Sequence, residues 1–183
     1  MYCSTKELWN TAANRGLTNI TMANNKPWDK NFAAWKFSKT EPVATEPANN
    51  IGFDFWAGYD DYSVGWVYDL TTKRYQRHNG GKKQIDFNSQ EQLTTKNLIV
   101  QFVPEVKSID VHGHNLYKLV GTGKGVLYQN GTKQDISWSK ASRAARTVYK
   151  VAGGKEVEFL PGNIWIEIVP SGNQISHEAI PQS

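Results

Sequence analysis

The chain has 183 residues, which suits one domain or one domain plus a piece of another, and its single cysteine, Cys3, excludes an internal disulfide. Hydrophobic residues make up 39% and aromatic residues 12%, with seven tryptophans, a balance that favours half-buried β-sheet surfaces. The formal net charge of +4 would attract an anionic surface or polymer, although solubility is the plainer explanation. No stretch approaches the roughly 18 apolar residues of a membrane span, so no transmembrane helix is predicted.

The first predicted element is a helix over residues 4–15. Ser4 and Glu7 have the spacing of a capping box, in which the Ser4 hydroxyl accepts a hydrogen bond from the Glu7 amide. Four apolar residues then share one helical face, and Gly16 ends the helix. Residues 40–50, with two prolines among polar residues, are typical of an extended surface connection and mark the best candidate for a boundary.

From residue 51 the hydrophobic pattern changes to a period of two, which predicts β-strands. Within residues 62–68, for example, every second residue is apolar or aromatic. Residues 98–103 form a continuous apolar run, which predicts a buried strand. Residues 106–111 and 116–120 flank a polar loop at 112–115 and predict a hairpin.

The clearest local signal is a β-hairpin over residues 119–138. Asn130 and Gly131 form the preferred pair for a two-residue type I′ turn, because both positions of that turn need a positive φ. Residues 126–128 form the first arm, and Ile136 and Trp138 alternate on the second. A second, shorter pair of strands is expected to follow, and it contains the most apolar run of the chain, residues 164–169. Together these elements predict an α+β fold, a mostly antiparallel β-sheet domain with the N-terminal helix packed on it.

An ordered set of segments resembles the YerB-like lipoproteins of bacteria, a family whose function is not defined. Residues 93–100, Leu-Thr-Thr-Lys-Asn-Leu-Ile-Val, are similar to the family segment Leu-Thr-Ala-Lys-Asn-Val-Val-Val, and residues 120–125 resemble its Val-Gly-Ser-Gly-Lys-Ala. The other similar segments are residues 2–8, 67–69 with 74–75, 138–140, and 161–170. In this order they span nearly all of the chain up to Pro170.

The resemblance implies an extracytoplasmic setting, with attachment to the membrane through a lipid in the complete protein, and it does not imply an enzyme. Members usually carry a lipidated cysteine and a larger N-terminal α/β domain. We therefore expect residues 1–50 to be the helix and connection from the end of a missing N-terminal domain. Residues 51–170 are then the β-rich C-terminal domain, and residues 171–183 are a flexible polar tail.

Two motifs could suggest a bound group, and neither supports one. Residues 121–125, Gly-Thr-Gly-Lys-Gly, lack the spacing and the following helix of a phosphate loop, so a tight entry into the hairpin is expected. His112 and His114 would face one side of a strand as a usable metal pair, but zinc needs further ligands. We predict a solvated loop there, with no metal and no cofactor.

Catalytic signals are weak. Four aspartates cluster in predicted turns, where Asp caps the backbone: Asp54, Asp60, Asp61 and Asp69. The sequence has neither a Gly-x-Ser-x-Gly elbow nor a His-Glu-x-x-His helix. The residues therefore favour a protein without catalytic activity.

Residues 136–155 contain five basic residues and no acidic one, which is the unusual charge feature of the chain. Lys140, Arg143 and Arg146 are spaced three apart, so a helical turn would place them on one face, with Trp138 just before them. The plain interpretation is a solvated loop. The functional one is an anion-binding site, in which the basic groups contact carboxylate or phosphate and the indole stacks on a sugar or ring. These four residues are the predicted ligand-binding site.

Two functional hypotheses follow. The first is a non-catalytic binding or scaffold module of the cell envelope, with an anionic cell-wall polymer or an envelope protein as partner. Nucleic acid is disfavoured because the aromatic residues are not interleaved with the basic ones, and membrane contact is expected only through a lipid anchor that this chain lacks. The alternative is an envelope enzyme whose active site needs the missing N-terminal half.

Overall fold

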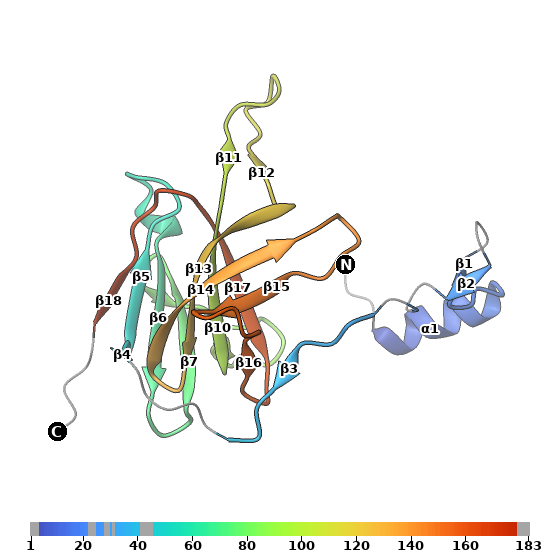
Figure 1. Ribbon diagram of the computed structural model, residues 1–183, viewed down its shortest axis with the longest axis horizontal. Helices are drawn as coiled ribbons and strands as arrows, with labels where there is room; N and C mark the ends of the chain where they lie inside the picture. Colours follow the sequence, from blue (N-terminus) through green and yellow to red (C-terminus); the bar gives the residue numbers. More distant parts are fainter. Residues whose placement is uncertain (1–3, 22–24, 28–29, 31, 41–45, 179–183) are drawn as a thin grey trace. The chain divides into compact units, whose positions relative to one another are not determined.

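The computed structural model describes residues 4–21, 25–27, 30, 32–40 and 46–178, and it divides the chain into two compact units, Met1–Ala34 and Trp35–Ser183 (Figure 1). None of the helices within the described residues is long and apolar enough to cross a membrane.

The first unit contains the predicted helix, which is confirmed as α1 (Thr5–Asn14). The Ser4 hydroxyl accepts a hydrogen bond from the Glu7 amide at 3.1 Å, as a capping box requires, and Gly16 follows with a φ of 65°. Strands β1 (Ile20–Thr21) and β2 (Lys26–Pro27) pair antiparallel after the helix. That α1 packs on the main sheet stays a prediction.

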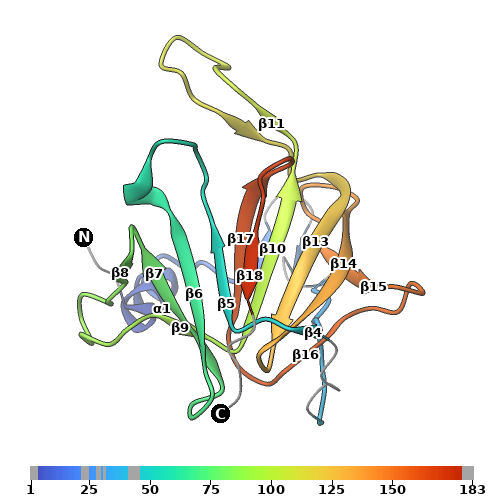
Figure 2. The same cartoon turned by 90° about the vertical axis from the view of Figure 1, so that its left-hand side faces the viewer.

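The second unit consists mainly of two six-stranded sheets (Figures 1 and 2). The first sheet has the order β18-β5-β6-β7-β8, with β9 paired to β7. Its strands are β5 (Asn50–Phe53), β6 (Val64–Asp69), β7 (Arg74–Asn79), β8 (Lys82–Lys83), β9 (Thr94–Thr95) and β18 (Ser176–Glu178). The second sheet has the order β15-β14-β13-β10-β17, with β4 paired to β14. Its strands are β4 (Glu46–Pro47), β10 (Asn97–Val103), β13 (Gly121–Gln129), β14 (Thr132–Lys140), β15 (Val148–Val151) and β17 (Ile164–Pro170).

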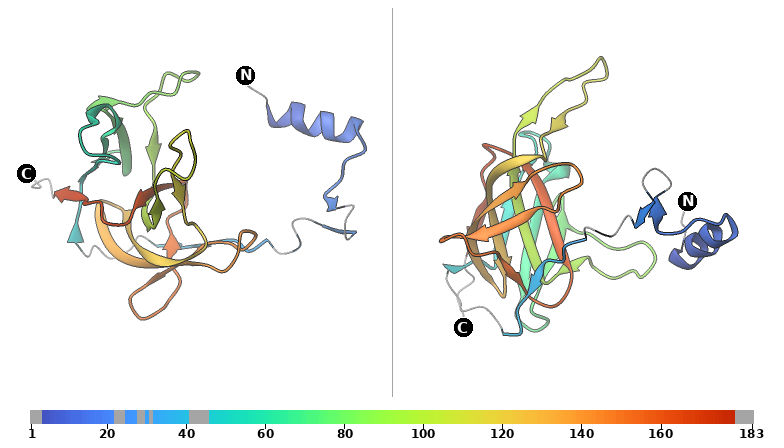
Figure 3. Two further views of the ribbon diagram at one scale, coloured as in Figure 1. Left: turned by 90° about the horizontal axis from the view of Figure 1, so that it is seen from above. Right: turned by 45° about the vertical axis from the view of Figure 1, so that its right-hand side comes forward.

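The predicted central hairpin is confirmed as β13 and β14, which pair antiparallel from Gly121↔Lys140 to Gln129↔Thr132. Its turn residues Asn130 and Gly131 have φ values of 49° and 72°, the positive pair that a type I′ turn requires. The hairpin predicted around residues 112–115 is present with shorter arms, as an antiparallel pair of β11 (Glu105–Val106) and β12 (Leu116–Tyr117), so its loop spans residues 107–115. This arm projects from one end of the sheets (Figure 3).

The apolar run at residues 164–169 is a strand, but the prediction that it belongs to a second short hairpin was wrong. It lies in β17, which pairs parallel with β10 along the full length of both strands. A parallel pair inside a sheet is covered on both faces, so its strands carry continuous apolar runs instead of alternating ones. Residues 98–103 and 164–169 show that pattern. The fold is therefore mixed, with antiparallel pairing dominant and one parallel pair in the second sheet.

The two faces of the second sheet belong to two different cores. Between the sheets, Leu98, Val100 and Tyr128 pack with residues of the first sheet such as Trp66 and Tyr75. On the opposite face lies the outer core, formed by eight buried residues, Ile99, Val103, Leu127, Ile136, Trp138, Tyr149, Val157 and Phe159, with Trp35 packed against them. Neighbouring residues of one strand thus enter different cores because side chains alternate across a pleated sheet.

The ends of this unit differ from the predicted boundaries. Strand β3 (Lys36–Phe37) pairs parallel with β16 (Glu158–Phe159), and β4 pairs with β14, so the described residues between 35 and 50 belong with the sheets and are not a plain connection. Likewise, β18 extends the first sheet by pairing with β5, so residues 176–178 are not a loose tail. Short strands at sheet edges carry little sequence signal, which explains both errors.

Candidate functional site

The structure buries one of the four residues of the predicted anion site. Trp138 is 2% exposed and lies in the outer core, where its Nε1 donates a hydrogen bond to the carbonyl oxygen of Phe102 at 2.9 Å. An indole in that position cannot stack on a bound sugar. The expectation that Trp138 contacts a ligand is therefore corrected: its role is packing.

The three basic residues do not share a helical face, because residues 141–147 form a bend and a turn, not a helix. Lys140 ends β14 and its Nζ donates to the Ala145 carbonyl oxygen. Arg146 Nη1 lies 2.6 Å from Glu156 Oε1, and this hydrogen bond lowers the pKa of the Glu156 carboxyl. Glu156, beyond the acid-free run, thus folds back onto the predicted site. Arg143 remains on the exposed turn.

The histidine pair lies in the loop of the projecting arm. The imidazole rings of His112 and His114 are 5.7 Å apart, and His114 Nδ1 lies 2.6 Å from Asp110 Oδ2. The hydrogen bond with His114 is the main cause that lowers the pKa of Asp110. Among the described residues, no group of three or more His, Cys, Asp or Glu side chains could hold a metal ion. That His112 and His114 bind no metal stays a prediction.

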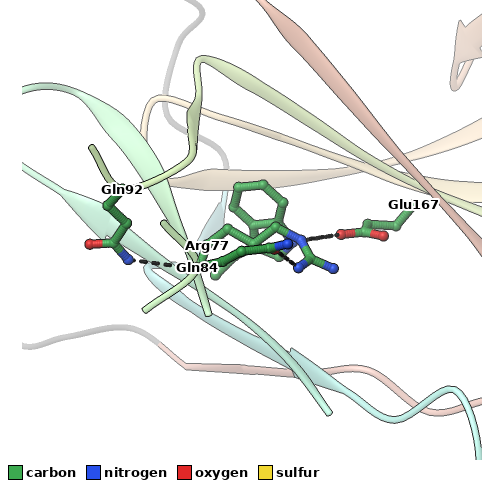
Figure 4. Close-up of polar contacts among 5 residues, drawn as sticks. Arg77, Gln84, Gln92 and Glu167 are labelled. Carbon is green, nitrogen blue, oxygen red and sulfur yellow. Dashed lines mark hydrogen bonds and ion pairs between the residues drawn. The ribbon is translucent and has the colours of Figure 1, made fainter. Parts of the chain in front are cut away.

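A buried ion pair joins the two sheets (Figure 4). Arg77 Nε of β7 lies 3.2 Å from Glu167 Oε1 of β17, and both side chains are almost completely buried. The guanidinium group lies over the rings of Trp66 and Trp165, at 5.7 and 5.3 Å from their centroids. Trp66 Nε1 also donates to Glu167 Oε1, at 3.1 Å, and Gln84 accepts from Arg77. The enclosure of these charges indicates a structural role.

An open pocket of about 920 Å³ lies where three distant segments meet: the loop after β5, the start of β11 and the turn after β17. Its size is within the range of small-molecule sites. The first segment contributes aromatic side chains, and the other two contribute polar ones. Among the described residues that line the pocket there is no histidine, serine or cysteine, so this part of the lining has no nucleophile with a histidine base.

The loop from residue 54 to residue 62 is held in place at both ends. Asn173 Nδ2 donates to the carbonyl oxygens of Asp54 and Phe55, at 2.7 and 3.2 Å. At the other end, where the short 3₁₀-helix η1 (Asp60–Tyr62) precedes β6, Asn79 Nδ2 donates to the carbonyl oxygen of Asp61 at 2.8 Å. The loop is thus fixed by side chains from β7 and from the turn after β17.

The aromatic side chains of this loop form a continuous chain of ring contacts from the core to the surface. Phe53 is buried and meets Phe55 edge to face, with centroids 5.4 Å apart. Phe55 contacts Trp56, and Trp56 meets Tyr62 at 5.7 Å with an angle of 79° between the rings. The outer members are open to solvent: Trp56 is 40%, Tyr59 61% and Tyr62 54% exposed. Exposed aromatic rings beside a pocket are typical of binding surfaces.

The charged residues of the lining are Asp54, Glu105 and Lys107. Glu105 Oε1 accepts a hydrogen bond from Asn115 Nδ2 at 2.8 Å, which ties the start of the projecting arm to its far strand. This aromatic pocket escaped the sequence analysis, although its signal was present. Residues 53–62, Phe-Asp-Phe-Trp-Ala-Gly-Tyr-Asp-Asp-Tyr, hold five aromatic residues in ten, more than a surface turn needs.

The fold and the pocket define a two-sheet β-rich domain with an aromatic surface site. The chain matches the family described as "Protein of unknown function (DUF3048) C-terminal domain" over residues 54–166, and it belongs to this family. It is 28% identical over 130 residues to the protein called "Putative lipoprotein YerB" of Bacillus subtilis (strain 168), across 68% of this chain and 38% of the relative.

The crystal structure of the YerB protein from Bacillus subtilis is similar to this chain with a TM-score of 0.71 at 24% identity. The similarity covers 94% of this chain and 54% of the solved one, so the chain spans about half or less of the length of these relatives. The predicted resemblance to the C-terminal part of the YerB-like family is confirmed.

Proposed function

We propose that this chain is part of a non-catalytic binding module of the cell envelope, located outside the cytoplasm, and that it binds through the aromatic pocket. The observation that carries the proposal is the exposed corner of Trp56 and Tyr62 beside the cavity. The lipoprotein name of the curated relative supports the location. Rings left in solvent cost hydrophobic free energy, which a ligand would recover by covering them.

The test is co-sedimentation of the chain with purified envelope, with Trp56→Ala and Tyr62→Ala as variants. Phe87→Ala is the matched control, because Phe87 is 77% exposed and does not line the pocket. We expect Trp56→Ala to lower the affinity by about tenfold or more, as for a binding hot spot, and Phe87→Ala to leave it unchanged. Equal retention of all the variants, or no retention of the wild type, would overturn the proposal.

An anionic polymer remains a proposed partner for the exposed turn at Arg143. Arg146→Glu is no longer a clean test of this contact, because it would place a carboxylate against Glu156. Arg143→Glu avoids that conflict. If the turn binds such a polymer, this variant should sediment less and the wild type should lose binding as salt rises, since exposed charge contacts are screened. Retention that is independent of salt and of Arg143 would contradict the contact.

The alternative function is an envelope enzyme whose site needs residues beyond this chain. The observation that favours it is the pair of carboxylates, Asp54 and Glu105, in one pocket, since hydrolytic sites often use two. Release of soluble fragments from envelope by the complete protein, abolished by Asp54→Asn, would support the enzyme. Retention without release supports the binding module.

A further inference from the structure

We propose that the aromatic pocket recognises an organic ammonium group, such as a choline-type or lysine-type cation. This inference rests on the proposed function, because it names the ligand class of the same site. Three features of the pocket lead to it: the arrangement of its rings, its charges, and its hydrogen-bond acceptors.

The first feature is the corner formed by Trp56 and Tyr62. Their rings stand at 79° to each other, so they offer two walls instead of one flat platform. Phe55 contacts Trp56 and is itself packed against the core between the sheets, which holds the indole in place. A flat sugar ring stacks on a single open face, whereas a rounded group fits between two walls. Aromatic faces attract cations through the ring quadrupole, and Trp and Tyr do so well.

The second feature is the sign of the local charge. Residues 54–62 contain three acidic residues, Asp54, Asp60 and Asp61, and no basic one, in a chain whose net charge is +4. Of these, Asp54 lines the pocket together with Glu105 of β11, and Lys107 is the basic residue among the described lining residues. The carboxylates outnumber the ammonium group, so the field at the pocket favours a positive ligand.

The third feature is the pair of carboxylates that accept hydrogen bonds. Asn173 uses its amide to hold the loop through the carbonyl oxygens of Asp54 and Phe55, and Gln174 Nε2 donates to the Gly172 carbonyl oxygen at 3.4 Å. The lining also holds donors, on Trp56, Tyr59, Tyr62 and Lys107. The carboxylates of Asp54 and Glu105 only accept hydrogen bonds at neutral pH, so they suit a lysine-type ammonium group, which donates them.

The experiment is a titration of the full chain followed by NMR of the Trp56 indole N–H, which Trp56→Phe assigns. One arm uses choline against dimethylbutanol, its neutral isostere. The other uses Nα-acetyl-lysine methylamide, which keeps its side-chain ammonium group, against Nα-acetyl-norleucine methylamide, which has no charge. The comparison of the two arms separates choline-type from lysine-type sources. We expect a cation to bind with a Kd on the order of 1 mM, since cation–π attraction at exposed sites is modest, and its neutral partner to bind at least about fivefold more weakly.

Charge variants sharpen the test. Lys107→Gln removes a like charge and should tighten cation binding by about two- to fivefold, whereas Asp54→Asn should weaken it by a similar factor. If the lining offers only apolar contact, the Kd of the cation will be the same in both variants as in the wild type, which would contradict the inference.

The outcomes separate the two proposals. If each neutral compound binds as well as its cation, or if neither cation shifts the Trp56 signal, the ammonium inference is overturned, while Trp56-dependent envelope retention would still uphold the binding module. If a cation binds selectively but retention on envelope is independent of Trp56, the ligand class stands and the envelope function fails.

Discussion

At Gly131, backbone conformation and packing both exclude a side chain. Its φ is 72°, and a Cβ built there would lie 2.8 Å from Asn49 Oδ1 and 2.9 Å from the ring of Tyr68. We expect Gly131→Ala to lower the free energy of unfolding by about 2 kcal/mol or more, because left-handed strain and overpacking add. Gly153→Ala is the control: Gly153 has a φ of 84° and no neighbouring atom within 4 Å, so about 1 kcal/mol is expected. Urea denaturation measures both, and equal losses would contradict the packing constraint.

The buried pair of Arg77 and Glu167 is a second residue-scale determinant. Arg77→Met would leave the Glu167 carboxylate buried without its cation, and we expect a loss of about 3 to 5 kcal/mol. The double variant Arg77→Met, Glu167→Gln should be clearly more stable than Arg77→Met alone. The reason is that the introduced amide is neutral and can still accept the hydrogen bond of Trp66 Nε1. A double-mutant cycle by chemical denaturation measures the coupling, and additive losses would refute it.

At the scale of elements, the segment between β14 and β15 is tied down by the contact of Arg146 with Glu156. The hydrogen bond with Arg146 holds the folded-state pKa of Glu156 below its ordinary value of 4.5, so the carboxylate adds stability above that value. This contribution is lost as the pH falls through the folded-state pKa. We therefore expect Glu156→Gln to be less stable than the wild type at pH 7, with a difference that shrinks as the pH falls from about 5 to about 3.

Arg146→Met provides the control background for this titration. Without the guanidinium group the main cause of the lowered pKa is gone, so Glu156→Gln should then change the stability by nearly the same amount at every pH. Thermal unfolding between pH 3 and pH 7 gives the comparison. The contact would be dismissed as a stabilising element if the pH dependence were the same in both backgrounds.

At the scale of the whole molecule, both cores of the second unit are built from residues that follow Ala34. A chain that starts at Trp35 should therefore still fold and unfold cooperatively. A chain that starts at Thr40 loses Trp35, whose Nε1 donates to the Thr147 carbonyl oxygen at 2.9 Å and whose ring contacts Phe159. That loss should cost about 3 kcal/mol and lower the Tm by about 6 to 12 °C. Equal Tm values for the two truncations would argue against this role of Trp35.

The sequence alone determined the local elements of this protein. The helix cap at Ser4, the turn at Asn130 and Gly131, and the buried strand at residues 98–103 were all predicted, and the family was recognised from ordered segments. These features depend on residues close together in the chain. Capping, positive φ and hydrophobic period act over a few residues, so the sequence states them directly.

Only the tertiary structure decided which strands pair over a distance and which side chains reach solvent. Strand β17 could have formed a hairpin by its sequence, but it pairs parallel with β10. Trp138 could have been exposed, but Trp35 and Phe159, which cover its face of the sheet, come from distant parts of the chain. The aromatic pocket likewise needs three separate segments. A pleated strand always presents two faces, and whether a face is buried depends on what the rest of the chain packs against it.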